Sequence, residues 1–293
     1  MTTFTDNLTI KQIKQQAASI AETLAVPQFW LTDWLLYVID KPSLFLMTDE
    51  RYQLTDSESA KFNAGIKKMQ QGIPLAYLTG HQAFWSLDFK VNAHTLIPRP
   101  DTEVLVEQVL EWIENNPIAN HKASKRLLDL GTGSGCIAIS LAHELARSSW
   151  QVIAVDLSAE ALSVAQQNAT DNQVDNVKFI QSSWYEALPS DAIQRFEVIV
   201  SNPPYIDEAD EHLQGLKAEP ISALSAPNKG LADIEHIVEQ APNYLQQGGL
   251  LAIEHGYDQG EAVRALFAAN GFEAIKTAKD YGGNERVTLG QLK

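Results

Sequence analysis

Apolar residues in the first part of the chain recur at the three- to four-residue spacing of amphipathic helices. The first run consists of Ile10, Ile13, Ala17, Ile20 and Leu24. Pro27 can open a second helix, because proline fits the first turn of a helix. Asp56 or Ser57 can start a third helix that runs to Met69. Residues 1–80 are therefore predicted to form a small helical domain.

The hydrophobic period changes between His81 and Ile97, where apolar residues fall among polar ones as they do in β-strands. The apolar positions are Phe84, Leu87, Phe89 and Val91. The run Ser86-Leu87-Asp88 is the expected turn of a β-hairpin. We therefore expect residues 81–98 to link the helical domain to a second, larger domain over residues 99–293.

Beyond residue 99, helical and apolar stretches alternate, which is typical of a mostly parallel sheet covered by helices on both faces. Helices are expected from Asp101, as a cap, to about Asn115, and at Ser134–Ala146, Ala159–Ala169, Ile234–Leu245 and Glu261–Asn270. Strands are expected at Arg126–Leu130, Gln151–Asp156, Val177–Gln181, Glu197–Ser201 and Leu250–Glu254. Glu273–Thr277 and Arg286–Leu289, around a turn at Tyr281–Asn284, can add an antiparallel edge hairpin. The predicted fold class is α/β.

Charge is distributed unevenly along the 293 residues, whose net charge is −15. Residues 1–80 carry 7 Lys and Arg against 8 Asp and Glu, whereas the remainder carries 15 against 29. An acidic domain repels a phosphate backbone, so nucleic acid is not expected as a partner.

Composition also bears on the compartment. The chain shows no apolar stretch of 18 residues and no basic-then-apolar leader, so we expect a cytoplasmic protein with no membrane partner. Cys136 is the single cysteine and lies in an apolar run typical of a buried helix face, so no intrachain disulfide can form. We expect a monomer, and no metal.

A glycine-rich run, Asp129-Leu130-Gly131-Thr132-Gly133-Ser134-Gly135, follows the first strand of the larger domain. Glycines let the backbone turn tightly and approach a ligand closely. Asp156, at the end of the next strand, can accept hydrogen bonds from both hydroxyls of a ribose.

The spacing of this run excludes three other motifs. The dinucleotide fingerprint needs a glycine where Cys136 stands, and a P-loop needs a lysine after Gly135. The nucleophile elbow needs a serine where Gly133 stands. The form D-x-G-x-G-x-G resembles the first motif of the class I methyltransferases, which bind S-adenosylmethionine.

The run Asn202-Pro203-Pro204-Tyr205 follows the fourth strand of the sheet, at the edge where open α/β sheets bind ligands. An amide nitrogen is a poor nucleophile, because its lone pair is delocalised into the carbonyl. Acceptors that hold its two N–H groups can turn that lone pair toward a methyl carbon. The side-chain oxygen of Asn202 and the carbonyl of Pro203 can provide two such acceptors, and Tyr205 can pack against the flat group. Positioning is then the main catalytic device.

With both motifs placed, nearly the whole chain, from about Leu8 to Leu289, resembles the peptide chain release factor N(5)-glutamine methyltransferase family. The matching segments are Tyr77–Gly80, Phe84–Ser86, Ile97–Glu103, Asp129–Gly135, Asn202–Tyr205, Glu219-Pro220 and Asn284–Val287. The segment Pro98-Arg99-Pro100-Asp101-Thr102-Glu103 is the more specific part, since the Asn202–Tyr205 motif also occurs in nucleic-acid methyltransferases. The resemblance implies a Rossmann-like class I methyltransferase sheet.

The resemblance also implies the site residues and the substrate. The cofactor, S-adenosyl-L-methionine, would contact Gly131, Thr132, Gly133, Ser134, Gly135, Asp156, Trp184 and Asn202. The substrate glutamine would be held by Asn202, Pro203, Pro204 and Tyr205, with Asn202, Pro203 and Tyr205 as catalytic residues. That glutamine belongs to the Gly-Gly-Gln loop of bacterial release factors, which is small enough for a pocket framed by the 205–229 loop and the hairpin.

One segment departs from the family pattern. Lys217-Ala218 stands before Glu219-Pro220, where the family commonly has Arg-Phe. We expect a modest change in substrate docking from this difference.

The residues alone leave two alternatives open. The same four-residue motif would serve an N-methyltransferase that acts on an exocyclic nitrogen of a nucleobase in RNA or DNA. The other alternative is a non-catalytic S-adenosylmethionine-binding module that docks partners through its helical domain. The intact Asn202–Tyr205 motif speaks against it.

Overall fold

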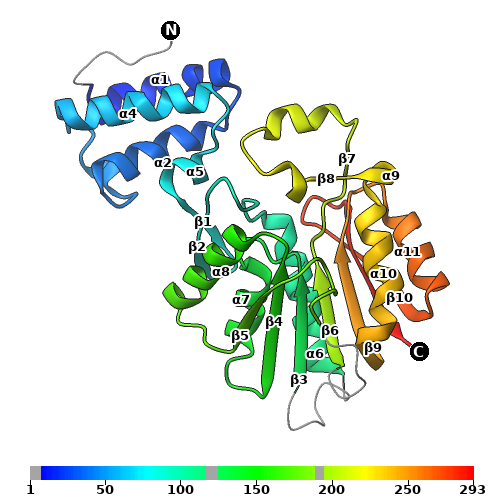
Figure 1. Ribbon diagram of the computed structural model, residues 1–293. Helices are drawn as coiled ribbons and strands as arrows, with labels where there is room; N and C mark the ends of the chain where they lie inside the picture. Colours follow the sequence, from blue (N-terminus) through cyan, green and yellow to red (C-terminus); the bar gives the residue numbers. More distant parts are fainter. Residues whose placement is uncertain (1–7, 117–124, 189–194) are drawn as a thin grey trace. The chain divides into compact units, whose positions relative to one another are not determined.

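The computed structural model describes residues 8–116, 125–188 and 195–293 (Figure 1). The polar start of the chain, Met1 to Asn7, lies outside the described residues. The chain divides into two compact units, Met1–Gly80 and His81–Lys293.

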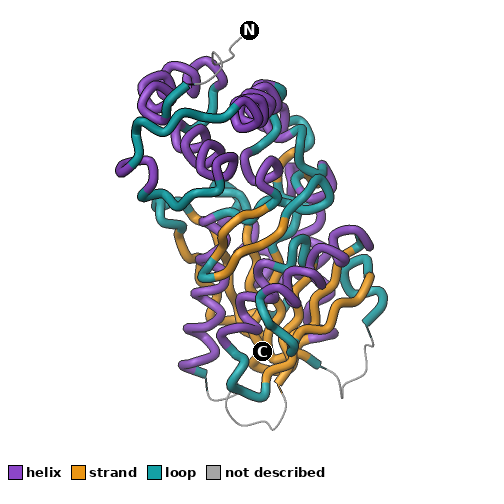
Figure 2. Tube along the Cα trace, turned by 90° about the vertical axis from the view of Figure 1, so that its left-hand side faces the viewer, coloured by secondary structure: helices purple, strands orange, loops and turns teal. Residues whose placement is uncertain are grey.

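The first unit consists of helices joined by loops (Figure 2). They are α1 (Ile10–Leu24), α2 (Gln28–Ile39), α3 (Phe45–Thr48), α4 (Asp56–Gln70) and α5 (Leu75–Thr79). Their apolar faces enclose a core that includes Ile13, Leu31, Leu35 and Phe62. The helical prediction for this stretch is therefore confirmed.

Capping boxes start α1 and α4. The side chain of Thr55 accepts from the backbone N–H of Glu58, and the Glu58 carboxylate accepts from the backbone N–H of Thr55. Thr9 and Gln12 form the same arrangement at α1. Asp56 is the first residue of α4, as predicted, but Thr55 is its cap.

The second unit opens with a β-hairpin of β1 (His81–Phe84) and β2 (Leu87–Lys90). The prediction of a turn at Ser86–Asp88 was wrong, because Phe84 pairs directly with Leu87 and the turn is Trp85-Ser86. Trp85 takes a left-handed φ of 57°. Its backbone N–H donates to Glu103 Oε1 at 2.7 Å, which holds the turn against the following helix.

Seven strands of the second unit form one sheet within the described residues, in the order β10-β11-β9-β6-β3-β4-β5. Their bounds are β3 (Lys125–Leu130), β4 (Trp150–Asp156), β5 (Val177–Gln181), β6 (Phe196–Ser201), β9 (Leu245–Glu254), β10 (Phe272–Lys279) and β11 (Glu285–Leu292). β3 pairs in parallel with both β4 and β6, whereas β11 runs antiparallel to β9 and β10. The mostly parallel sheet with an antiparallel edge hairpin is confirmed.

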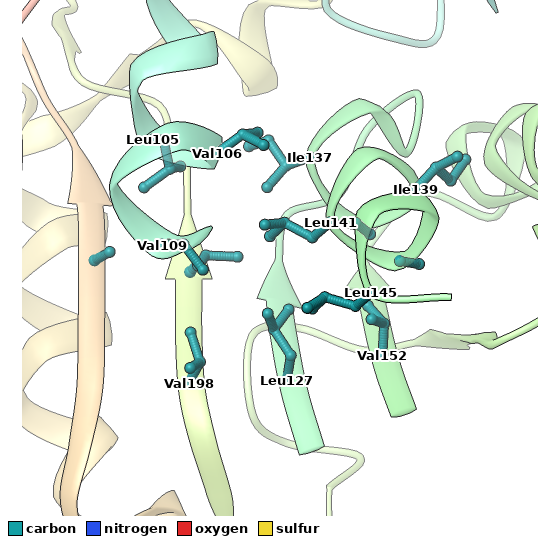
Figure 3. Packing of buried hydrophobic residues seen from close by; sticks show 14 of the residues in the cluster. Leu105, Val106, Val109, Leu127, Ile137, Ile139, Leu141, Leu145, Val152 and Val198 are labelled. Carbon is teal, nitrogen blue, oxygen red and sulfur yellow. The ribbon is translucent and has the colours of Figure 1, made fainter. Parts of the chain in front are cut away.

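Helices cover both faces of this sheet (Figure 1). α6 (Glu103–Asn115), α7 (Cys136–Glu144) and α8 (Ala159–Asp171) pack on one face, and α10 (Ala232–Tyr244) and α11 (Gly260–Ala269) on the other. Figure 3 shows Val109 of α6 and Leu141 of α7 over the strand residues Leu127 and Val198. Burial of this continuous apolar layer fixes the edge of the sheet on which the candidate site is built.

Two predicted helix starts were wrong. Asp101 does not cap α6, because Pro100–Thr102 forms a 3₁₀ turn, η1, that leads directly into it. α7 begins at Cys136 instead of Ser134, since Gly135 has a left-handed φ of 84° that a helix cannot continue.

The long connection after β6 contains short elements. β7 (Ile206–Asp207) pairs with β8 (Ser225–Ala226), and the 3₁₀ turns η4 (Glu211–Leu216) and η5 (Ile221–Ala223) lie between them. α9 (Pro227–Gly230) then leads into α10. Among the described residues, no helix has both the length and the apolar character needed to cross a membrane.

The packing of α4 on α2 gives a test of the first unit. A Cβ atom on Gly65 would lie 2.1 Å from Cε2 of Trp34, whose indole N–H donates to the Phe62 carbonyl at 3.0 Å. Gly65→Ala should therefore lower the free energy of unfolding by about 2 kcal/mol, measured by urea titration. Gly215→Ala is the matched control, because no atom beyond its own residue and its two chain neighbours lies within 4 Å of its Cβ position. Equal stability of the two variants would contradict this packing.

Candidate active site

A cavity of about 450 Å³ lies in the second unit, where β3, β4, β5 and β6 end. The chain leaves β3 toward β4 on one side and returns to β6 on the other, so a crevice forms at this edge. The residues that line it are Ala93, His94, Leu96, Pro98, Arg99, Thr102, Gly131–Ser134, Cys136, Ile137, Asp156–Ser158, Ala161, Ser182–Trp184, Asn202, Pro204, Pro220, Ser222, Ala223 and Asp233.

The glycine-rich turn after β3 forms one wall of the cavity. Gly131, Gly133 and Gly135 all take left-handed φ values, of 71°, 55° and 84°. A Cβ on Gly131 would also lie 3.3 Å from the Trp184 ring. Glycine is thus needed at Gly131 both for the turn and for the close approach of the tryptophan.

Asp156 joins this turn to the end of β4. Its Oδ2 accepts from the backbone N–H of Gly133 at 2.8 Å, and its Oδ1 accepts from that of Ser158 at 2.9 Å. Each carboxylate oxygen can accept a further hydrogen bond. Burial raises the pKa of Asp156, and the backbone N–H groups oppose that shift. The side chain is therefore fixed toward the cavity with acceptor capacity to spare.

Asp129 lies behind the turn and is completely buried. Thr132 donates its hydroxyl to Oδ2 of Asp129 at 2.6 Å. Burial raises the pKa of Asp129 to about 7, and the Thr132 hydroxyl partly opposes this shift. The carboxyl group braces the turn and does not line the cavity.

Trp184, which follows β5, lies against Gly131 on the cavity wall. It has a left-handed φ of 47°, and the Ser182 hydroxyl donates to its carbonyl at 2.9 Å. Its side chain also lies close enough to Asp233, another lining residue, to oppose the rise that burial causes in the pKa of that carboxyl. The aromatic ring is thus held in place from two sides.

Asn202 and Pro204 line the cavity next to the glycine-rich turn, as the position after β6 predicts. Asn202 Nδ2 donates to Thr102 Oγ1 at 3.3 Å. Pro203 is buried and Tyr205 is half-buried, and neither lines the cavity. The Tyr205 hydroxyl instead donates to Glu254 Oε1 at 3.2 Å.

Glu219 fastens the long connection to the segment before α6. Its buried carboxylate pairs with Arg99 Nη2 at 2.5 Å and accepts from the Ile97 backbone N–H at 3.0 Å. Pro220, Ser222 and Ala223 of the same connection line the cavity, as do Pro98 and Arg99. The strands of the hairpin, β1 and β2, do not.

The structure thus brings Gly131, Thr132, Gly133, Ser134, Asp156, Trp184, Asn202 and Pro204 to one cavity, and places Gly135, Pro203 and Tyr205 directly beside these residues. Cys136 also lines it, and burial raises the pKa of its thiol to about 12, which disfavours a reactive thiolate.

Sequence reasoning did not single out Thr102, Asp233 or Glu254 as site residues. Glu254 ends β9 at the same sheet edge as Asp129 and Asp156, and that position is the signal that could have found it.

The lining favours a ligand that carries hydroxyl donors and positive charge. Asp156 and Asp233 provide carboxylates, while the guanidinium of Arg99 is already paired with Glu219. A phosphate would find few partners there, whereas the ribose and sulfonium of S-adenosylmethionine fit this set. Among the described residues, no group of acidic, histidine and cysteine side chains is arranged to hold a metal ion.

Comparisons with known proteins agree with this geometry. A family model described as a methyltransferase domain matches residues 121–287, and one described as the PrmC N-terminal domain matches residues 27–80. The fold resembles a Pyrococcus furiosus methyltransferase (TM-score 0.50, 18% identity, 71% of this chain and 90% of that one). It also resembles the hMettl16 catalytic domain in complex with an RNA hairpin of the MAT2A 3′UTR (TM-score 0.54, 15% identity, 88% and 91%). Fold and cavity together define a class I methyltransferase that uses S-adenosylmethionine.

Sequence relatives narrow the class further. Release factor glutamine methyltransferase of Escherichia coli (strain K12) is 47% identical over 88% of this chain and 89% of the relative. The protein of the same name from Pasteurella multocida (strain Pm70) is 47% identical over 81% of this chain and 82% of the relative. The one from Shewanella oneidensis is 42% identical over 88% of this chain and 86% of the relative. The chain belongs to the release factor glutamine methyltransferase family, as the resemblance predicts.

The position of Asp156 gives a binding test. We propose that Asp156 accepts hydrogen bonds from the ribose of the cofactor. Asp156→Ala should weaken binding of S-adenosylmethionine by about 10- to 100-fold, since hydrogen bonds to a charged group are lost, measured by isothermal titration calorimetry. Asp175→Ala removes an exposed aspartate before β5 and should leave the affinity unchanged. Unaltered affinity in both variants would refute this role.

Burial of Asp129 predicts a pH dependence of stability. Its pKa is about 7 in the folded chain, above the value of an exposed aspartate, so the folded state holds the proton more tightly. This contribution to the free energy of unfolding is therefore present at low pH and is lost as pH rises from about 4 to 7.

Asp129→Asn cannot ionise, so it should avoid this loss. Relative to the wild type, its free energy of unfolding should rise by about 2 kcal/mol as the pH goes from 5 to 8. Urea titrations at both pH values measure this difference, with Asp175→Asn as the exposed control. The same pH response in wild type and Asp129→Asn would contradict the shifted pKa.

Proposed function

We propose that this protein transfers a methyl group from S-adenosylmethionine to the side-chain amide nitrogen of the glutamine in the Gly-Gly-Gln motif of peptide chain release factors. One observation carries the proposal: Asn202, within the run Asn202–Tyr205, lines the cavity beside the glycine-rich turn. The names of relatives that are 42–47% identical over most of their length support it.

Within this site, S-adenosylmethionine supplies an electrophilic methyl group on a sulfonium. Asn202 Oδ1 accepts one N–H of the substrate amide and the carbonyl of Pro203 accepts the other. Tyr205 and Pro204 stiffen and frame that position. No general base is needed, because the proton leaves after the nitrogen has become cationic.

The cofactor residues of this proposal are Gly131–Gly135, Asp156, Trp184 and Asn202. The tight turn lets the backbone approach the ligand, Asp156 takes the ribose, and the Trp184 ring stacks on the adenine. Their common position around one cavity supports this assignment.

The proposal also assigns roles to the domains. Residues 1–80 bind the release factor, residues 81–98 link the two domains, and residues 99–293 catalyse the methyl transfer. Phe29, Tyr37, Leu44 and Met47 are exposed on the first unit, and such apolar residues suit a protein contact. Lys217-Ala218, beside the anchor Glu219, makes substrate docking differ modestly from that of relatives with Arg-Phe.

The protein works on this proposal as a monomer in the cytoplasm, and it needs no nucleic-acid or membrane partner. The net charge of −15 disfavours phosphate backbones. Size-exclusion chromatography with light scattering measures the oligomeric state.

An Asn202 variant tests the proposed chemistry. With tritiated S-adenosylmethionine and purified release factor, Asn202→Ala should lower kcat by at least about 100-fold, because an acceptor that orients the reacting nitrogen is lost. Asn243→Ala, an exposed asparagine on α10, should behave like the wild type. Wild-type protein that labels RNA or DNA but not release factor would support the nucleobase alternative instead. An Asn202→Ala variant with full activity would contradict the proposed role.

A further inference from the structure

Glu254, at the end of β9, is a buried carboxylate that the chemistry above does not use. It interacts with three groups from different parts of the second unit. The Tyr205 hydroxyl donates to its Oε1 at 3.2 Å, and the Thr102 hydroxyl and the Arg286 guanidinium both favour its ionised form. Burial disfavours the charged form of a carboxylate, so a glutamate at this position lowers the stability of the fold.

Thr102 connects this carboxylate to the candidate catalytic amide. Asn202 Nδ2 donates to Thr102 Oγ1 at 3.3 Å, and a hydroxyl that accepts one hydrogen bond has a single proton left to donate. The Thr102 hydroxyl favours the ionised form of Glu254, as a hydroxyl proton directed at a carboxylate does. The hydrogen bond from Asn202 to Thr102 gives this arrangement its direction.

A fixed direction decides which end of the Asn202 amide faces the cavity. With Nδ2 held by Thr102, Oδ1 is the end left to accept from an incoming N–H group. A flipped amide would turn its own N–H groups toward the incoming N–H group, and two donors cannot form a hydrogen bond. The two orientations are nearly equal in shape. Something other than shape must therefore select the productive one.

Two segments that the chemistry leaves without a role are part of this arrangement. Thr102 belongs to the Pro98–Glu103 segment, and Arg286 belongs to Asn284–Val287. Arg286 is itself held by Asp280, with Nη2 to Oδ2 at 3.0 Å, and lies 3.8 Å from Asp101 Oδ2. Burial raises the pKa of Glu254 to about 7, and the positive charge of Arg286 opposes this shift and so favours the ionised form.

We propose that Thr102 and Glu254 are positioning residues that hold the Asn202 amide with its oxygen toward the acceptor nitrogen. This inference rests on the proposed function. Thr102 holds the amide directly, and Glu254 restrains Tyr205 at the other end of the Asn202–Tyr205 run and favours the same direction through its interaction with the Thr102 hydroxyl.

The test separates a positioning role from a structural one. Thr102→Val keeps the shape and removes the hydroxyl, so kcat for release factor methylation should fall by about 10- to 100-fold. KM for release factor and the affinity for S-adenosylmethionine should change by less than about threefold. Thr102→Ser restores the hydroxyl and should recover most of kcat.

Glu254→Gln provides a second, independent variant with a matched control. Glu197 is also buried and lies on the same sheet but at the opposite end, where it accepts from the backbone N–H of Arg126 at 2.7 Å. Glu254→Gln should lower kcat by about 10-fold or more, whereas Glu197→Gln should leave it within twofold of the wild type. Should Thr102→Val fail to bind S-adenosylmethionine, this pair decides the question.

The proposal is overturned if Thr102→Val and Glu254→Gln both keep kcat within twofold while Asn202→Ala loses it, or if Thr102→Ser is as impaired as Thr102→Val. A wild-type protein that fails to methylate release factor would instead defeat the proposed function.

Discussion

Every part of the candidate site depends on one geometric constraint, namely that parallel strands end at the same edge of their sheet. β3, β4, β5 and β6 bring the glycine-rich turn, Asp156, Trp184 and Asn202 together, although these residues are far apart in sequence. The crevice forms where the chain switches sides of β3. The two apolar layers that cover the sheet hold this edge in place and so set the relative positions of the proposed cofactor and substrate groups.

Buried carboxylates are the second common feature of this edge. Asp129 braces the turn through Thr132, Glu219 fastens the long connection to Arg99, and Glu254 gathers Thr102, Tyr205 and Arg286. Burial raises the pKa of both Asp129 and Glu254 to about 7, so these positions lower the stability that the fold could otherwise reach. Such a cost is typical of sites where precise orientation matters more than stability.

Local patterns predicted most of this arrangement, and contacts between distant residues account for what was missed. Helical spacing, alternation and the two motifs were enough to predict the sheet, its edge hairpin and the place of the glycine-rich turn, Asp156 and Asn202 at one edge, whereas Trp184 was implied only by the family resemblance. The turn at Trp85-Ser86 depends on how Phe84 pairs with Leu87, which residue types alone do not decide. The contacts of Glu219 with Ile97 and of Asn202 with Thr102 join residues 122 and 100 positions apart, so no local signal marks them.

The identity of the atom that receives the methyl group decides whether the proposed function is right. Mass spectrometry of purified release factor, after incubation with this protein and S-adenosylmethionine, measures it most directly. The account predicts one added methyl group, located by fragmentation on the side chain of the glutamine in the Gly-Gly-Gln motif. A methyl group on any other residue, or an unmodified release factor in the presence of active protein, would contradict it.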